Sequence, residues 1–443
     1  MTAIAAKALS AQIASLGFGA ADGLRYGSLG FPLAFCALPL YVLLPNLYAR
    51  EFGIPLATLG AILLGSRLFD ALTDPLLGQL SDRLYAKSFR AVFVSGALAA
   101  IFLGLGFWFI FFPPWHGQLH LLIGLGVLLV ITYAAYSALA ICHQSWGAML
   151  GGDEAQRSRI VAWREGLGLA GVVLAAVIPS LLGLQAMLVL FLTSLALGWL
   201  AWTQSMKPDP HACKRPIGPS VKDHVGESVW HPWRTRAFRR LMGVFMLNGI
   251  ASAVPATLVL FFVQDRLQAS EAIQPVFLGL YFVCGALAMP LWLRLVRRLG
   301  LARSWLVGML TSITVFLWAL QLGTDDVVAF GVVCALSGIA LGGDLVLPGA
   351  ILAGIIADAG DDGQAEGIYF GWWNFATKLN LALAAGVALP LLAWFGYAPG
   401  ARDAQSLQAL SLAYCGLPCL LKAIAAISLY VLVIRPNPLR KPL

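Results

Sequence analysis

Charged residues are scarce along this chain. Asp, Glu, Lys and Arg make up 11% of its 443 residues, and hydrophobic residues make up 60%. A soluble domain carries about 25% charged residues, so this shortage excludes an ordinary soluble protein. The apolar runs recur along the chain and approach the ~20 residues that a membrane-spanning helix needs. Because they are continuous instead of alternating, they predict helices and not the strands of a barrel.

Sequence signatures of catalysis are also missing. The chain has no P-loop, no G-x-S-x-G and no H-E-x-x-H. Its seven cysteines are an odd number, scattered without metal-ligand spacing, which argues against a disulfide framework and against a zinc site. We therefore expect no enzyme and no cofactor beyond a coupling ion. A membrane enzyme or a receptor would need a catalytic cluster or an appended soluble domain, and the sequence offers neither.

The net charge of +8 comes from basic residues in alternate short loops. This is the positive-inside pattern of membrane topology, so it predicts orientation and no nucleic-acid partner. The basic loops follow the second, fourth, sixth and eighth apolar segments, and the chain ends on Arg435, Arg440 and Lys441. We expect both termini in the cytoplasm, an even number of spans and a multi-pass location in the inner (plasma) membrane.

Twelve apolar segments fit this orientation. They are 27–49, 54–80, 91–112, 119–149, 160–183, 185–204, 238–263, 273–294, 302–322, 327–356, 367–395 and 407–434. The one long polar interval, 205–237, divides them into a six-helix half at 1–204 and another at 238–443. A weak echo between PLLGQLSDR (75–83) and PLWLRLVRR (290–298) agrees with two related halves.

The second span carries charge where it is costly. Arg67, Asp70 and Asp74 lie at i, i+3 and i+7, so they share one helix face. A charge at mid-membrane costs roughly 3 kcal/mol on insertion scales, and neighbouring carboxylates repel unless a cation, a proton or Arg67 lies between them. Asp70 and Asp74 are therefore predicted to bind a monovalent metal cation or a proton, with Thr73 and Ser137 as neutral oxygen ligands. The alternative is an Arg–Asp pair that braces two helices.

Other polar residues inside the spans are candidates for the transport path. Lys378 can neutralise the acidic pair when the cation is absent, or it can extend to the membrane interface. Asp344 and Lys422 have no partner that the sequence identifies. The fourth span is the most polar, and its His143 is equally well explained as a structural histidine. The predicted substrate-binding residues are Tyr136, His143, Gln144, Trp146, Trp373 and Asn374.

Charges also mark the cytoplasmic ends of helices in the first half. Asp82 and Arg83 end the second span, and Arg157 and Arg159 precede the fifth. We expect these four residues to form contacts that hold one transport state and release in the other.

The segment RLFDALTDPLLGQLSDR (67–83) resembles the second-helix signature of the glycoside–pentoside–hexuronide:cation symporters, the melibiose permease family of the major facilitator superfamily. DEAQRSRIVAWREGLGLAG (153–171) and GQAEGIYFGWWNFATKLNLALAAG (363–386) resemble its helix-five and helix-eleven segments. The resemblance implies a twelve-helix major facilitator fold with cation-binding carboxylates at Asp70 and Asp74. It matches Thr73 to an Asn ligand and Ser137 to a Thr ligand, and it places Arg67, Arg164 and Lys378 in the family's charge network.

The chain departs from the family's sugar site. The acids that hold sugar hydroxyls in galactoside transporters fall near Pro32 and Ala140, and the stacking aromatic becomes Gln144. We therefore predict a monomeric secondary transporter that couples Na⁺ or H⁺ to uptake of a small organic solute, such as a sugar or glycoside, by alternating access. The alternative of the same fold is an uncoupled uniporter or a transporter of lipids or amphiphiles.

Overall fold

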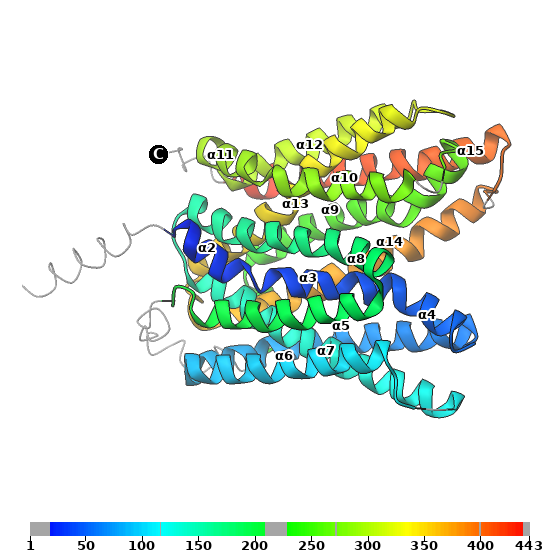
Figure 1. The fold of residues 1–443 in the computed structure, drawn as a ribbon. Helices are drawn as coiled ribbons and strands as arrows, with labels where there is room; N and C mark the ends of the chain where they lie inside the picture. Colours follow the sequence, from blue (N-terminus) through cyan, green and yellow to red (C-terminus); the bar gives the residue numbers. More distant parts are fainter. Residues whose placement is uncertain (1–17, 116, 209–227, 271–272, 398–399, 437–443) are drawn as a thin grey trace, which may run out of the picture.

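The computed structural model describes residues 18–115, 117–208, 228–270, 273–397 and 400–436. Helices account for its regular secondary structure over these residues and run side by side along one axis (Figure 1). The first half of the chain contains α2 (Ala20–Gly27), α3 (Gly30–Leu38), η1 (Pro39–Leu43), α4 (Leu44–Arg50), α5 (Leu56–Lys87), α6 (Phe89–Phe111), α7 (Gln118–Met149) and α8 (Glu154–Thr203).

The second half begins after the polar interval. It contains η3 (His231–Arg234), α9 (Arg236–Phe261), η4 (Phe262–Arg266), α10 (Gln274–Leu287), α11 (Met289–Leu299), α12 (Leu301–Ala319), α13 (Val327–Ala359), α14 (Glu366–Trp394), α15 (Ala404–Ser411), η6 (Leu412–Gly416), α16 (Leu417–Leu429) and η7 (Tyr430–Ile434). Much of the predicted linker 205–237 lies outside the described residues. Its described end carries η3.

The membrane-spanning helices agree with the twelve predicted segments. Among the described residues, nine helices are long and apolar enough to cross a membrane, or ten when the bent pair α10 and α11 counts as one span. The 50-residue α8 holds two spans, because Gly183 breaks it with a φ of 84° that only glycine adopts freely. The 32-residue α5 completes the set; it is long enough to span, but it carries the charged residues of 67–87.

The buried apolar side chains form three clusters. One consists of residues between 18 and 206, and another of residues between 250 and 417. The third joins α7 and α8 to α9, α13 and α14, so it connects the two halves of the chain. These packed surfaces fix the helices that carry the intramembrane charges relative to one another.

Candidate functional site

Two helices from opposite halves of the chain approach closely through small residues. A Cβ atom built on Gly78 of α5 would lie 2.3 Å from the carbonyl oxygen of Gly367, and one built on Gly371 would lie 2.6 Å from that of Asp74. Gly367 and Gly371 form a G-x-x-x-G pattern, which lets membrane helices pack with their backbones in contact. The pattern brings α14 against the charged face of α5.

This close approach places Lys378 between the two carboxylates of α5. Its Nζ lies 2.6 Å from Asp70 Oδ2 and 2.7 Å from Asp74 Oδ2. The same ammonium donates hydrogen bonds of 2.8 Å to Asp74 Oδ1 and to the hydroxyl of Ser137 on α7. Ser137 in turn donates to Asp70 Oδ1 over 2.8 Å. Three helices therefore meet at one lysine.

The composition of this cluster suits exchange of cations. Two carboxylates and one ammonium leave a net charge of −1, and Asp74 and Ser137 are fully buried. Asp74 Oδ2 has no aligned hydrogen-bond donor, although it lies next to the ammonium. A buried carboxylate oxygen without a hydrogen bond is costly. The carboxylate and hydroxyl oxygens that surround Lys378 Nζ are also the hard oxygen ligands that a small cation needs, so a cation has suitable ligands in the same place.

The other predicted members of the cation site and charge network lie apart from this cluster. Thr73 donates its hydroxyl to the backbone carbonyl of Asp70, one turn back in its own helix, over 2.9 Å. The guanidinium of Arg67 stacks on Tyr41, with Cζ 4.1 Å from the ring centroid, a cation–π contact in place of an ion pair with Asp70 or Asp74. Arg164 pairs with its neighbour Glu165 at 2.6 Å. Of the three residues predicted for the charge network, Lys378 contacts the two carboxylates in this conformation, and a role for Arg67 and Arg164 stays a prediction.

The predicted substrate-binding residues are divided between different environments. His143 is fully buried with Nε2 2.8 Å from the carbonyl of Tyr26, so it joins α7 to α2. Trp146 is also fully buried and donates to the carbonyl of Met206 over 3.0 Å. In this conformation both side chains pack within the first half, and contact of either with substrate stays a prediction.

The remaining four predicted residues lie in different places. Gln144 lines a cavity of about 10 Å³ between α7, α8 and α13. Trp373 stacks on Phe245 of α9, with ring centroids 3.7 Å apart. Tyr136 and Asn374 are partly buried. Substrate contact by these four residues stays a prediction.

At one end of the bundle, a carboxylate of α5 accepts hydrogen bonds from backbone amides of α14. This end, which we call the basic end, carries the ends of α5, α6, α8 and α11 with Arg83, Lys87, Arg90, Arg157, Arg159, Arg297 and Arg298. Asp82 of α5 accepts hydrogen bonds from the amides of Gly367 (2.6 Å) and Ile368 (2.9 Å), in the first turn of α14. Carboxylates are stabilised at helix N-termini, where unpaired amides and the helix dipole favour negative charge.

A second carboxylate repeats the arrangement. Glu154 of α8 accepts from the amide of Leu301, the first residue of α12, over 2.9 Å. Sequence reasoning missed Glu154, since its acceptor role depends on a helix start 147 residues away. Of the predicted gate residues, Asp82 contacts the other half of the chain, whereas Arg83 is exposed and Arg159 donates to the carbonyl of Phe18 over 3.0 Å.

Arg157, the fourth predicted gate residue, lies next to a helix of the other half of the chain. The Arg157 guanidinium lies beside Gly354 of α13, where a Cβ would meet it at 2.8 Å. At the basic end, the described carboxylate contacts between α5 and α14 and between α8 and α12 are made to backbone amides, and a gating role of the four predicted residues stays a prediction.

A bundle of membrane-spanning helices with an ion-paired cluster between its two halves is typical of transporters of the major facilitator class. The comparison with known protein families supports this class. The family model described as "MFS/sugar transport protein" matches residues 23–435. The chain therefore belongs to this family of transport proteins, and it is a multi-pass membrane protein.

Two proteins of Escherichia coli (strain K12) are similar in sequence. One is YagG, whose name describes it as a candidate glycoside/cation symporter; it is 22% identical over 91% of this chain and 89% of its own length. The other is the inner membrane symporter YicJ, 26% identical over 37% of this chain and 34% of its own length.

Solved structures share the fold. An outward-facing bacterial homologue of the iron transporter ferroportin superposes with a TM-score of 0.68 at 16% identity, covering 94% of this chain and 99% of that chain. The human organic anion transporter MFSD10 gives a TM-score of 0.61 at 18% identity, with 94% and 100% covered. At these identities the likeness shows the major facilitator fold alone.

Proposed function

We propose that this chain is a cation-coupled symporter of a glycoside-type solute that works by alternating access, and that Asp70 and Asp74 bind the coupling Na⁺ or H⁺. The observation that carries the proposal is the position of the Lys378 ammonium, 2.6 and 2.7 Å from the two carboxylates. A lysine at this position neutralises part of the negative charge of Asp70 and Asp74 when the cation is absent. A cation or proton that enters displaces it.

The coupling follows from the charge of the cluster. When the cation takes the carboxylates, Lys378 is released from α5, and the ion pairs between α5 and α14 are broken. Since α5 and α14 belong to opposite halves, the cation changes the relative stability of the two transport states. A solute that prefers the same state then binds more tightly, and the effect is reciprocal.

The solute class rests on relatives. YagG carries glycoside/cation symport in its name, and the family model is one of sugar transport. We place the basic end, with both termini, in the cytoplasm of a cell whose inner membrane holds the transporter as a monomer. The basic loops support this orientation through the positive-inside rule.

Uptake into proteoliposomes tests the coupling. The purified protein takes up a radiolabelled glycoside from a panel of α- and β-glycosides, driven by an inward Na⁺ or H⁺ gradient. Asp70→Asn and Asp74→Asn are expected to abolish the dependence on that gradient. Asp344→Asn serves as the matched control, because Asp344 is also an intramembrane acid paired with a lysine but lies in a different cluster. Gradient-independent flux in the wild type, or unchanged coupling in both variants, would refute the proposal.

A further inference from the structure

A second lysine–aspartate pair lies inside the C-terminal half. Lys422 of α16 approaches Asp344 of α13 with Nζ 2.8 Å from Oδ2, and it donates to Ser252 of α9 over 2.8 Å. The other oxygen of Asp344 accepts from Trp305 Nε1 over 2.9 Å, and Ser252 also donates to Asp344 over 3.3 Å. The cation-binding cluster proposed above uses none of these groups.

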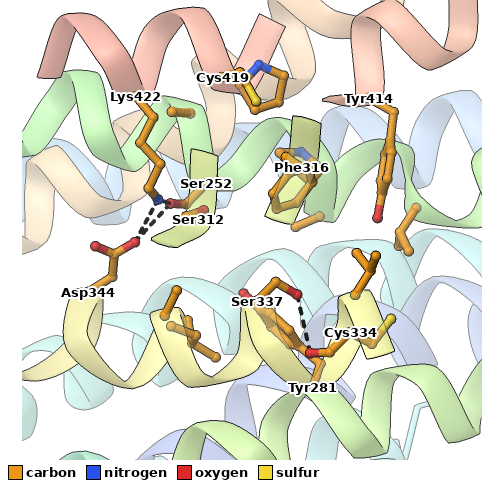
Figure 2. Close-up of a pocket in the computed structure, with 18 of the residues that line it drawn as sticks. Ser252, Tyr281, Ser312, Phe316, Cys334, Ser337, Asp344, Tyr414, Cys419 and Lys422 are labelled. Atoms are coloured by element: carbon orange, nitrogen blue, oxygen red, sulfur yellow. Dashed lines mark hydrogen bonds and ion pairs between the residues drawn. The ribbon is translucent and has the colours of Figure 1, made fainter. Parts of the chain in front are cut away.

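The pair forms one end of a cavity (Figure 2). The cavity has a volume of about 140 Å³ and is lined by α9, α10, α12, α13, η6 and α16, all from the second half. Figure 2 shows Lys422, Asp344 and Ser252 at one end, and the rings of Phe316, Tyr414 and Tyr281 along the rest. Since a water needs roughly 10–15 Å³ on this measure, the space suits a molecule of about ten non-hydrogen atoms.

The polar end of the cavity has a hydrogen-bond donor left over. An ammonium group has three N–H bonds, and among the described residues the contacts of Lys422 use two of them, on Ser252 and Asp344. The carboxylate of Asp344 already accepts hydrogen bonds from Trp305, Ser252 and Lys422. A cationic head would have to compete with Lys422 for Asp344, whereas an acceptor head can take the third N–H.

The Lys378 cluster shows how an ammonium group with three oxygen partners is arranged in this protein. There, one ammonium holds two carboxylates and one serine hydroxyl. At Lys422 the serine and one carboxylate are present, and Lys422 itself lines a mostly apolar cavity. We propose that this cavity binds a small monocarboxylate with an apolar body, whose carboxylate accepts from Lys422 while its body lies among the aromatic rings. The site is separate from the cation site, and the proposal stands without the proposed coupling.

Isothermal titration calorimetry on the full-length protein in lipid nanodiscs tests the proposal. The probes are 3-phenylpropionate, 3-phenylpropanol and 3-phenylpropylamine, which share a body and differ in the head. The acid is expected to bind about tenfold or more tightly than the alcohol, since a hydrogen bond to a charged group contributes about 1.5–3 kcal/mol. The amine is expected not to bind. Equal affinities for the three, tighter binding of the amine, or no binding of the acid would overturn the proposal.

Variants separate a ligand role from a structural one. Lys422→Met removes the donor, and Ser337→Phe fills the cavity while leaving the ion pair intact; both are expected to abolish binding of the acid. Asp344→Asn removes the competing carboxylate, so the acid is expected to bind more tightly. A purely structural pair would give no such gain. Asp70→Asn is the control and leaves binding unchanged, so loss of symport in that variant does not affect this test.

The carboxylate can belong to an aromatic acid or to a short fatty acid, and an octanoate arm distinguishes them, because octanoate has the roughly ten non-hydrogen atoms that the cavity suits. Binding of 3-phenylpropionate without octanoate identifies an aromatic acid as the ligand. Binding of octanoate as well identifies a site for short fatty acids too. Retention of full affinity for the acid in Ser337→Phe would place the ligand elsewhere and refute the site.

Discussion

We expect that removal of the Lys378 ammonium, in the variant Lys378→Met, makes the free energy of unfolding of the transporter depend on a bound cation. In the wild type this group lies within 2.8 Å of oxygens of Asp70, Asp74 and Ser137. Lys378→Met leaves two carboxylates facing each other, one of them fully buried. Breaking a buried ion pair by removing one partner costs about 3–5 kcal/mol, so we expect the free energy of unfolding to fall by that order in a buffer without Na⁺.

A cation that occupies the vacated place restores part of this loss. A ligand that binds only the folded state stabilises it by about 2.7 kcal/mol at a hundred times its dissociation constant. Na⁺ at neutral pH, or a proton at mildly acidic pH, is therefore expected to recover about half of the lost stability or more. Thermal unfolding followed by intrinsic tryptophan fluorescence measures this, with choline chloride replacing NaCl at equal ionic strength.

The Lys422→Met variant is the matched control for the sodium measurement. It also leaves a buried acid without its lysine, but it leaves one carboxylate instead of two. We expect it to be destabilised and not to be rescued by Na⁺. If Lys378→Met unfolds at one temperature in choline, in Na⁺ and at both pH values, the two carboxylates do not bind a cation and the reasoning fails.

Three further changes test the contacts between helices. Gly78→Val inserts side-chain atoms where a Cβ would already lie 2.3 Å from a backbone oxygen of α14, so it is expected to separate α5 from α14. The separation is measured as faster maleimide labelling of a cysteine reporter introduced at the buried position Ser81 (Ser81→Cys). Unchanged labelling would contradict this prediction. Asp82→Ala removes two amide contacts worth about 1.5–3 kcal/mol each and is expected to raise labelling of the same reporter, with Arg83→Ala as a neutral control. Tyr397→Phe loses its hydroxyl bond to Asp265 and is expected to lower stability by about 1–2 kcal/mol in thermal unfolding without affecting that labelling.

The sequence was sufficient for the fold class and for part of the site. Apolar runs predict spanning helices because each span must satisfy its backbone hydrogen bonds internally and face lipid. The i, i+4 spacing of Asp70 and Asp74 places them on one face whatever surrounds the helix. Lys378 was identifiable as a partner because a lysine inside an apolar span requires an acid.

Other partners could not be read from the sequence, since several acceptors compete for each long cationic side chain. Arg67 lies one turn from Asp70, yet its guanidinium stacks on Tyr41. Arg164 pairs with the residue beside it in the chain. Asp82 accepts hydrogen bonds from backbone amides, and no sequence motif identifies these donors. Lys422 has an acid within reach, Asp344, that only the arrangement of α13 and α16 around one cavity identifies.

The sequence by itself therefore determined which residues had to be inside the membrane, which face of the second span was charged, and which end of the bundle was basic. These properties depend on local periodicity and on transfer of side chains from water to lipid. The tertiary structure decided which lysine meets which carboxylate, because Lys378 and Asp74 are 304 residues apart and meet only where Gly78, Gly367 and Gly371 let two helices touch. It also placed a cavity beside Lys422, since an empty volume depends on how five helices pack and not on any one of them.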